Sequence, residues 1–325
     1  MTKIAVLDDW QGVAHTSADW VELERQAEVV FHRDPFSSVD KLVSAVAGCE
    51  VLLIMRERTA FPAEVIERLG KLRMIALTGA RSWTIDMAAC NARGIAVCNT
   101  GSQHSTATTA ELALALLMAA ARRVPEADRS MRRWNFQADV PLGFMLEGRT
   151  LGVIGLGKIG SRMARYGQAL GMKVIAWSQN MTQEKAQAAG ARLVDKNTLL
   201  AESDAISLHV VLSDRTRGIL GAEDLARMKP GAILVNTSRG PLVDEAALVA
   251  ALNEGRIVAG LDVFGEEPLP AAHPLRSARN TVLTPHLGYC TSEIYQQFYR
   301  ESIENILAFL AGKPIRVINP EALKS

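Results

Sequence analysis

Short apolar runs alternate with helix-forming stretches along almost the whole chain, and this alternation limits the fold more than any other feature. Buried strands separated by helices are typical of β-α-β units, whose neighbouring strands run parallel. A first series of strands is expected in KIAVLD, VLLIM, MIALTG and IAVCNT, with helices in VDKLVSAVAG and PAEVIERL. A second series runs from TLGVIGLG to NTVLTPH. The pattern predicts an α/β protein with two doubly wound domains.

A long apolar helix is expected between the two series. The stretch TTAE places Thr108 three residues before Glu111, which is the spacing of a capping box at a helix start. This helix and the segment that follows it to Phe144 form a candidate dimer contact, and burial inside the subunit is the alternative explanation of their apolar character. A second helix is expected in SEIYQQFYRESIENILAFLAG, where it would return the chain to the first domain.

The charge and cysteine content exclude several classes of partner and site. The 36 basic and 35 acidic residues nearly cancel, so nothing favours a nucleic acid or an anionic membrane as partner. The longest apolar run covers half the length needed to cross a bilayer, and the N-terminus lacks a signal-peptide pattern. The four cysteines have no C-x-x-C spacing, which indicates reduced thiols rather than a metal site. We therefore expect a cytoplasmic protein without a metal.

A glycine motif stands between a predicted strand and a predicted helix. Gly155, Gly157 and Gly160 form G-x-G-x-x-G directly after LGVI and before SRMARYGQAL. In this context the glycines permit a tight turn, close approach of a pyrophosphate and close helix packing. The pyrophosphate would then bind the free N–H groups at the helix N-terminus. The motif predicts a bound dinucleotide.

The acidic residue that usually binds the adenosine ribose is missing. It is expected about 20 residues beyond the glycines, where this chain has Ser178, Gln179 and Asn180. No arginine or lysine adjoins Ser178 to bind a 2′-phosphate. The sequence favours NAD and leaves NADP as the alternative.

Three later segments end predicted strands with reactive side chains. LVNTSRG ends with Arg239, GLDVFGEEP contains Asp262, Glu266 and Glu267, and VLTPHLG contains His286. Singly, these residues fit a surface ion pair, a solvated acidic turn and a capping histidine. A cation, a carboxylate and an imidazole at three strand ends together predict a catalytic site.

The segments GLGKIG, NTSRG, LDVFGEEP and TPHLG, in this order and spacing, resemble the D-isomer-specific 2-hydroxyacid dehydrogenases. The stretch MRERT, from Met55 to Thr59, resembles the substrate loop of their phosphoglycerate dehydrogenase-like branch. The resemblance extends from about Ala5 to Asn319. It implies an NAD(P)-dependent interconversion of a small 2-keto acid and a D-2-hydroxy acid in a homodimer. It also implies two Rossmann-like domains with a cleft between them. The substrate domain would comprise residues 1–99 and 291–325, and the inserted cofactor domain residues 100–290.

The same resemblance implies a role for each matching residue. Arg239 would bind the substrate carboxylate and keto oxygen, His286 would act as the acid/base, and Glu267, rather than Glu266, would keep the histidine protonated and oriented. Asp262 would position the nicotinamide carboxamide. The implied cofactor contacts are Gly155, Gly157, Lys158, Ile159, Gly160, Ser178, His209, Thr216, Thr237, Asp262 and Gly288.

The substrate loops depart from the family pattern. Gly79 is kept in TGARSWTID, but Arg81 stands where a second glycine is common, and the loop that contains Ser105 lacks the usual Pro-Gly and Asn. Gly79, Ser105 and the cations Arg56, Arg58 and Arg81 are the expected substrate contacts, which suggests a substrate with a second anionic group such as 3-phosphoglycerate. Pairing of the arginines with nearby carboxylates such as Glu57 or Glu64 is the alternative.

Two other functions remain open at this point. The same scaffold serves as a cofactor-sensing regulator, although such a protein would want extensions for partners that this chain lacks. Phosphite oxidation would also suit a cation at Arg81. Formate oxidation is disfavoured because the formate enzymes carry glutamine where Glu267 stands.

Overall fold

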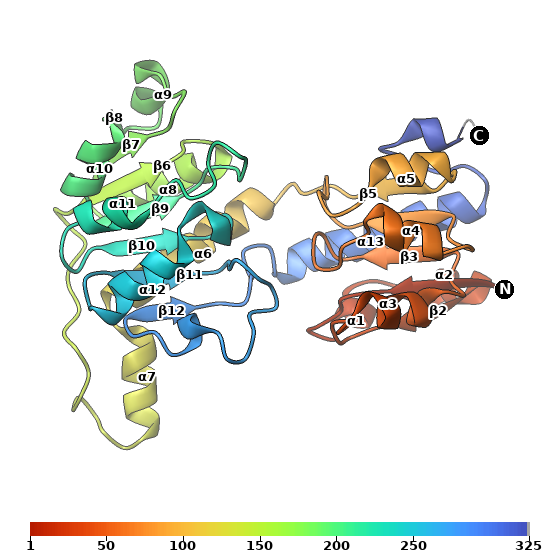
Figure 1. Ribbon diagram of the computed structural model, residues 1–325, viewed down its shortest axis with the longest axis horizontal. Helices are drawn as coiled ribbons and strands as arrows, with labels where there is room; N and C mark the ends of the chain where they lie inside the picture. Colours follow the sequence, from red (N-terminus) through yellow and green to blue (C-terminus); the bar gives the residue numbers. More distant parts are fainter. Residues whose placement is uncertain (324–325) are drawn as a thin grey trace. The chain divides into compact units, whose positions relative to one another are not determined.

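The computed structural model describes residues 1–323, which divide into two compact units. Unit 1 contains residues 1–104 and 291–323, and unit 2 contains Ser105–Cys290. The first division falls after His104 rather than after residue 99. Each unit is an α/β structure built on a single parallel sheet, as the alternating pattern predicts (Figure 1).

Unit 1 contains a five-stranded sheet in the order β2-β1-β3-β4-β5. Four of its strands are the predicted ones, and the edge strand β2 is an addition. Its apolar run is only three residues long, and exposed positions alternate with buried or half-buried ones along the strand. The strands are β1 (Thr2–Val6), β2 (Ala27–Phe31), β3 (Val51–Ile54), β4 (Met74–Leu77) and β5 (Ala96–Asn99). The helices are α1 (Ala14–Ser17), α2 (Val21–Gln26), α3 (Val39–Val46), α4 (Ala63–Arg68), α5 (Met87–Ala92) and α13 (Ser292–Leu310).

The last helix confirms the predicted return of the chain to the first unit. Helix α13 contacts β4 and β5 and also α1 and α2. The tail beyond it is extended, with an antiparallel bridge between Val317 and Cys98, and it ends in a short 3-10 helix, η3 (Pro320–Leu323). The buried side chain of Asn319 accepts a hydrogen bond from the backbone N–H of Val97 at 2.7 Å, which fixes the tail to β5.

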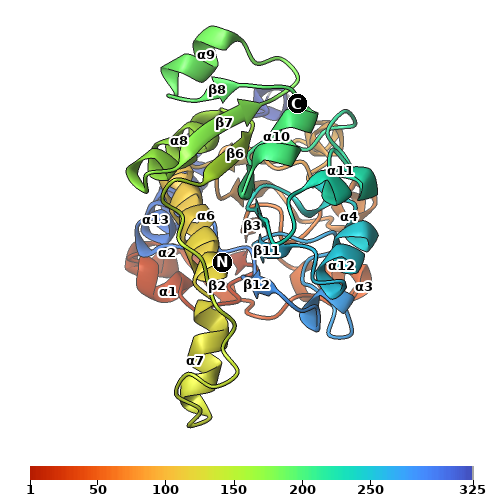
Figure 2. The ribbon, with the colours of Figure 1, turned by 90° about the vertical axis from the view of Figure 1, so that its left-hand side faces the viewer.

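Unit 2 contains a seven-stranded sheet in the order β12-β11-β10-β9-β6-β7-β8. Figure 2 shows α6 and α8 on one face and α10, α11 and α12 on the other, so the sheet is doubly wound. The strands are β6 (Thr150–Ile154), β7 (Lys173–Trp177), β8 (Arg192–Leu193), β9 (Ala205–Leu208), β10 (Ile233–Asn236), β11 (Val258–Leu261) and β12 (Thr281–Leu283). The helices are α6 (Ser105–Ala121), α7 (Val124–Arg132), α8 (Lys158–Ala169), α9 (Gln183–Ala188), α10 (Lys196–Glu202), α11 (Ala222–Arg227) and α12 (Glu245–Asn253), with 3-10 turns η1 (Gly240–Leu242) and η2 (Pro274–Arg276).

The long apolar helix α6 begins earlier than its sequence predicts. Its first residue is Ser105, whose carbonyl accepts hydrogen bonds from the hydroxyls of both Thr108 and Thr109. The predicted capping box at Thr108 and Glu111 is therefore wrong, because Thr108 already lies in the first turn. Helix α6 packs against β11, where a Cβ on Gly260 would lie 2.9 Å from Leu116. Burial inside unit 2 thus explains the apolar character of this helix.

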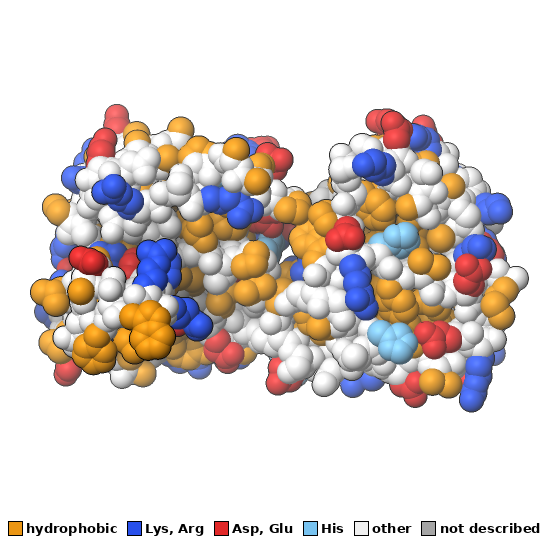
Figure 3. All heavy atoms as spheres, turned by 90° about the horizontal axis from the view of Figure 1, so that it is seen from below, with side chains coloured by type: hydrophobic (Ala, Val, Ile, Leu, Met, Phe, Trp, Pro, Cys, Tyr) orange, Lys and Arg blue, Asp and Glu red, His pale blue; other side chains and the backbone are white. Residues whose placement is uncertain are grey.

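Residues 122–148, here called the arm, carry α7 away from the rest of unit 2 (Figure 1). No residue of α7 is buried. Several large hydrophobic side chains of the arm are exposed, and Figure 3, which views the end where α7 projects, shows hydrophobic and basic side chains side by side. The exposed hydrophobic residues are Val124, Met131, Trp134, Phe136, Leu142 and Met145. None of the helices formed by residues 1–323 is long and apolar enough to span a membrane.

Candidate active site

The glycine turn joins β6 to α8 in unit 2. Gly155 has a φ of 95°, and a Cβ there would lie 2.8 Å from the backbone oxygen of His209. A Cβ on Gly160 would lie 1.9 Å from the oxygen of Gly155, so the strand and the helix approach each other only with glycine at this position. Gly157 differs from both, because no atom lies within 4 Å of its would-be Cβ. The space at Gly157 is therefore open to a ligand.

The N-terminus of α8 is free to bind an anion. Gly157 is the N-cap residue, no side chain caps the helix, and its first turn contains no acidic residue. The first backbone N–H groups of a helix have no partner within the helix and carry partial positive charge. Lys158 and Ile159 are the first two residues of this helix, and their binding of a pyrophosphate stays a prediction.

The cofactor would bind where the strand order of unit 2 reverses, between β6 and β9. Two predicted cofactor contacts, which directly follow β9 and its neighbour β10, have buried polar atoms without a hydrogen-bond partner among the described residues: Nδ1 of His209 and Oγ1 of Thr237. Buried polar groups are nearly always paired. These two atoms and the open space at Gly157 fit a dinucleotide that supplies the missing partners.

Burial lowers the pKa of His209 to about 4, so this imidazole is neutral near pH 7. Its Nε2 lies 2.8 Å from the hydroxyl oxygen of Ser207. Thr216 is placed differently, because its hydroxyl donates to the oxygen of Val211 at 2.7 Å and accepts from the N–H of Ser213 at 2.8 Å. The Thr216 side chain thus shapes its own loop, and a contact between it and the cofactor stays a prediction.

The corner after β7 contains no charged residue. Ser178 is half-buried, and its carbonyl accepts the N–H of Met181 at 3.1 Å in a tight turn. The exposed Gln179 and Asn180 occupy the middle of this turn. The hydroxyl of Ser178 has no hydrogen bond to the rest of residues 1–323, so it remains available to a ribose hydroxyl.

The three predicted catalytic residues follow neighbouring strands. Arg239 comes after β10, Glu267 after β11 and His286 after β12, and these strands are adjacent in the sheet. Nδ1 of His286 lies 2.5 Å from Oε2 of Glu267, and the N–H of Phe264 donates to Oε1 of Glu267 at 2.9 Å. Nε2 of His286 has no partner among the described residues. The structure therefore leaves one imidazole nitrogen for a substrate and occupies the other with a carboxylate.

The loop that carries Arg239 lies against the loop that carries Glu267. Burial alone would raise the pKa of Glu267, but the hydrogen bond and charge of His286 outweigh it, with smaller help from the Phe264 N–H and the Arg239 charge, so the pKa is lowered. The backbone brings these loops together, because a Cβ on Gly240 would lie 2.1 Å from the carbonyl carbon of Phe264. The site combines a guanidinium with a carboxylate-imidazole pair, as the sequence predicts.

Asp262 holds the turn that carries His286. Its Oδ1 accepts the hydroxyl of Thr284 at 2.6 Å and the N–H of Leu287 at 2.7 Å, and its Oδ2 accepts the N–H of Gly288 at 2.9 Å. Burial raises the pKa of Asp262 against these hydrogen bonds. His286 itself has a φ of 55°, a left-handed conformation that is costly for a non-glycine residue and that the turn must maintain. Sequence reasoning missed this role of Asp262.

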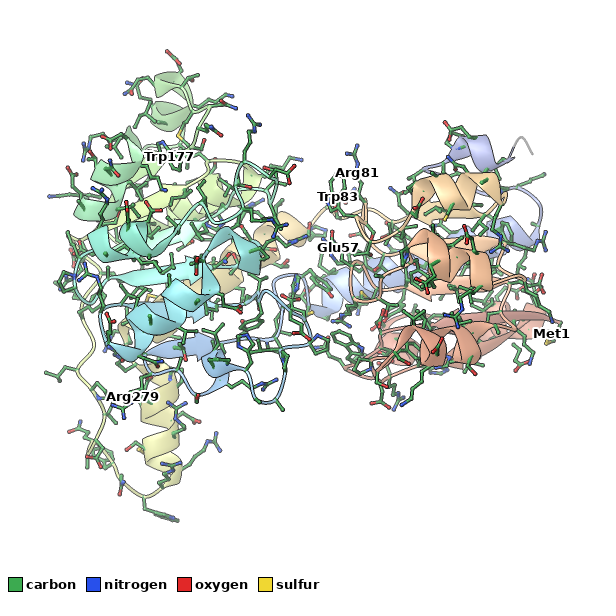
Figure 4. The ribbon with its side chains drawn as sticks, in the orientation of Figure 1. Met1, Glu57, Arg81, Trp83, Trp177 and Arg279 are labelled. Carbon is green, nitrogen blue, oxygen red and sulfur yellow. The ribbon has the colours of Figure 1, made fainter. Side chains whose placement is uncertain are left out.

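The predicted substrate residues of unit 1 follow β3 and β4. Gly79 has a φ of 86°, and a Cβ there would lie 2.7 Å from Nη1 of Arg56, so glycine lets this guanidinium lie against the backbone. Arg81 is exposed and extends from the loop after β4, as Trp83 does, while Glu57 comes from the neighbouring loop (Figure 4). Arg81 forms no ion pair within residues 1–323, and Glu64 lies 4.0 Å from Arg68 instead. Ser105, the remaining predicted contact, begins α6 in unit 2.

One group in unit 1 is absent from the sequence predictions. Asp8 follows β1, is fully buried and has a φ of 62°. Its Oδ1 accepts the hydroxyl of Thr59 at 2.8 Å, and its backbone oxygen accepts Nη1 of Arg58 at 2.6 Å. The position of Asp8 at a strand end, the signal that identifies Arg239 and His286, would have found it.

The model of the family described as "D-isomer specific 2-hydroxyacid dehydrogenase, NAD binding domain" matches residues 114–288. The chain belongs to this family. It is 41% identical to a glyoxylate reductase of Korarchaeum cryptofilum over 87% of this chain and 86% of that protein. It is 32% identical to a hydroxypyruvate reductase of Blautia hydrogenotrophica, covering 98% and 99% of the two chains. The crystal structure of a phosphoglycerate oxidoreductase from Vibrio cholerae superposes with a TM-score of 0.90 at 35% identity, covering 96% and 100%.

These matches confirm the resemblance carried by the four sequence motifs. The protein is an NAD-dependent oxidoreductase that interconverts 2-hydroxy acids and 2-keto acids. The matched relatives do not favour the alternative of a cofactor-sensing regulator.

His209 gives a pH-dependent stability that can be measured. The unfolded chain takes up a proton on this imidazole as the pH falls through about 6.5, whereas the folded protein does so only near the lowered pKa of about 4. The free energy of unfolding should therefore fall by about 1.4 kcal/mol per pH unit in this window from this group, or about 2 kcal/mol between pH 6.5 and pH 5. In urea unfolding at pH 7 and pH 5, His209→Gln should reduce the loss of stability by that amount.

The matched control is His15→Gln, whose side chain is 62% exposed in the native protein. This variant should keep the wild-type loss between pH 7 and pH 5. An equal loss in His209→Gln and wild type would contradict a buried neutral His209.

Proposed function

We propose that Arg239, Glu267 and His286 catalyse the interconversion of a small 2-keto acid and its D-2-hydroxy acid. The observation that carries this proposal is the 2.5 Å contact between Nδ1 of His286 and Oε2 of Glu267, with the charge of Arg239 acting on the same carboxylate. A regulator that only senses cofactor would not need a carboxylate-imidazole pair with one nitrogen left for a substrate. Unit 1 would be the substrate domain and unit 2 the cofactor domain.

The reduction needs one hydride and one proton. A reduced dinucleotide held at the glycine turn of unit 2 would supply the hydride. Arg239 binds the substrate carboxylate and polarises the keto oxygen through charge-assisted hydrogen bonds. As the carbonyl π bond breaks, its electron pair moves to that oxygen, which takes the proton from Nε2 of His286. Glu267 stabilises the imidazolium before transfer, and in the reverse direction His286 takes the proton back.

We propose NAD rather than NADP as the preferred cofactor. Ser178, Gln179 and Asn180 provide neutral hydrogen-bonding groups for the ribose hydroxyls. None of these residues supplies the positive charge that would compensate a 2′-phosphate. NADP binding would therefore gain no charge-assisted contact at this corner.

Arg81 supports a substrate with a second anionic group, such as 3-phosphoglycerate or its keto acid. This guanidinium is exposed at the carboxyl edge of the unit 1 sheet, the edge at which such sheets bind ligands. Of the three predicted substrate cations, Arg81 is the one whose side chain has no hydrogen bond or ion pair to the described residues. Its charge is thus available to a ligand.

Replacing Arg81 tests the substrate class. Arg81→Ala should raise the KM for 3-phosphohydroxypyruvate about tenfold, because a charge-assisted hydrogen bond is worth about 1.5 kcal/mol or more. The KM for glyoxylate, which has no second anionic group, should stay within about twofold. Steady-state assays of a keto-acid panel with NADH and NADPH measure both values and the cofactor preference.

Arg279→Ala is the matched control, since Arg279 is an exposed arginine of unit 2 without a contact to the described residues (Figure 4). It should change neither KM. Equal KM values for 3-phosphohydroxypyruvate in wild type and Arg81→Ala would remove the second anionic group from the proposal.

We also propose that the protein is a cytoplasmic homodimer that associates through the arm. Six large hydrophobic side chains of the arm are exposed, with Trp134 at 96% and Leu142 at 95%. An exposed apolar cluster of this size marks an interaction surface, and a twofold-symmetric copy is the commonest partner. The cytoplasmic location is supported by four cysteines that are all thiols.

The double variant Trp134→Ser and Phe136→Ser should shift the protein from dimer to monomer in sedimentation velocity, because it removes two apolar anchors of the arm. Trp83→Ser is the control, since Trp83 is 77% exposed but lies in unit 1. This variant should remain a dimer. A monomeric wild type, or an unchanged dimer in the double variant, would contradict association through the arm.

A further inference from the structure

Unit 1 contains a group of contacting residues at the point where its strand order reverses. We call Asp8, Trp10, Arg58 and Tyr295 the clamp. Strands β1 and β3 are neighbours there, and a ligand of such a sheet binds outside their carboxyl ends. The loop after β1 contains Asp8, and the loop after β3 contains Arg56. Both residues have left-handed backbones, with φ of 62° and 51°. Non-glycine residues keep such conformations only where surrounding contacts hold them.

Arg58 provides those contacts. Its Nη1 donates to the backbone oxygen of Asp8 at 2.6 Å, and its Nη2 donates to the hydroxyl of Tyr295 at 3.2 Å. The guanidinium carbon lies 4.5 Å from the centre of the Trp10 ring, a cation-π geometry. Tyr295 in turn donates to the side-chain oxygen of Gln11. One guanidinium thus joins the loop after β1, the loop after β3 and the first turns of α13.

Neighbouring contacts extend the clamp to Arg56. The N–H of Arg58 donates to the oxygen of Met55 at 3.1 Å, which closes a turn around Arg56. The N–H of Arg56 donates to the hydroxyl of Thr78 at 3.0 Å, and its guanidinium lies against Gly79. The direction of the Arg56 side chain therefore depends on a turn whose far end Arg58 anchors.

Several polar groups of the clamp are buried. Burial raises the pKa of Asp8 to about 6, against the hydrogen bond from Thr59 and the charge of Arg58. Oδ2 of Asp8 and Nε1 of Trp10 are buried and have no partner among the described residues. The hydrogen bonds that Asp8 does form therefore hold its position strongly, because losing one would leave a further buried group unpaired.

We propose that Arg58 is a positioning residue for substrate binding, which orients Arg56 through the clamp with Asp8, Trp10 and Tyr295 and does not itself contact the substrate. This inference rests on the proposed function, in which the cations of unit 1 bind the acid. It divides the predicted substrate arginines by role. Arg56 and Arg81 provide positive charge to the substrate, and Arg58 holds Arg56 in its orientation.

The test uses two substitutions that alter the clamp by different means. Arg58→Lys keeps the positive charge but loses the planar fork that reaches Asp8 and Tyr295 together. Tyr295→Phe keeps all charges and removes one hydroxyl. Each should raise the KM for the preferred keto acid about fivefold to tenfold, with kcat and the Kd of NADH within about twofold of wild type. The double variant should raise the KM by much less than the product of the two single effects, because both substitutions break the same clamp.

Tyr166→Phe is the matched control, since the Tyr166 hydroxyl in unit 2 makes no hydrogen bond within the described residues. This variant should leave all three constants unchanged. Urea unfolding of every variant shows whether the fold is retained, and a mere loss of stability would not produce a KM effect without a kcat effect.

The outcomes separate the two proposals. A KM that is unchanged in Tyr295→Phe but raised in Arg58→Ala and rescued in Arg58→Lys would show that Arg58 binds the substrate through its charge, which overturns the clamp. A KM increase in the double variant equal to the product of the two single increases would also overturn the clamp. A wild type that reduces no keto acid with either cofactor would instead overturn the proposed function.

Discussion

The 2.5 Å contact between His286 and Glu267 is the interaction on which the proposed chemistry of this protein depends. A carboxylate on Nδ1 fixes the ring and leaves Nε2 for the substrate, which is how a proton donor is oriented in many enzymes. The contact exists because Asp262 uses both carboxylate oxygens to hold the turn from Thr284 to Gly288. A left-handed backbone at His286 is the cost of this arrangement.

The sheet of unit 2 sets the distance between the proposed catalytic residues and the glycine turn. The strand order of unit 2 reverses between β6 and β9, where the glycine turn, His209 and the free N-terminus of α8 lie together. The proposed catalytic residues follow β10, β11 and β12, which continue the sheet from β9. A dinucleotide with its pyrophosphate at the N-terminus of α8 would therefore have the carboxyl ends of β9 to β12 available for its nicotinamide half. One parallel sheet accounts for both halves of the site.

Strand ends and periodic apolar patterns made most of the fold and of the candidate catalytic site predictable from the sequence. Arg239, Glu267 and His286 each follow an apolar run, and parallel strands bring such residues to one edge. Contacts between distant segments were not predictable, because nothing local signals them. Arg58 and Asp8 are an example, and so are the three hydrogen bonds to Asp262. The edge strand β2 has an apolar run of only three residues, and the helix at Ser105 begins before its apparent capping signal.

The most direct test of this account is the rate of reduction by Glu267→Gln, which removes one charge and keeps the shape of the side chain. With a keto acid and NADH, kcat/KM should fall by roughly 10² to 10⁴, the usual contribution of general acid catalysis. The Kd of NADH, measured by fluorescence titration, should stay within about twofold, since Glu267 lies outside the glycine turn. A kcat/KM within threefold of wild type, with NADH still bound, would contradict the central role of the carboxylate-imidazole pair.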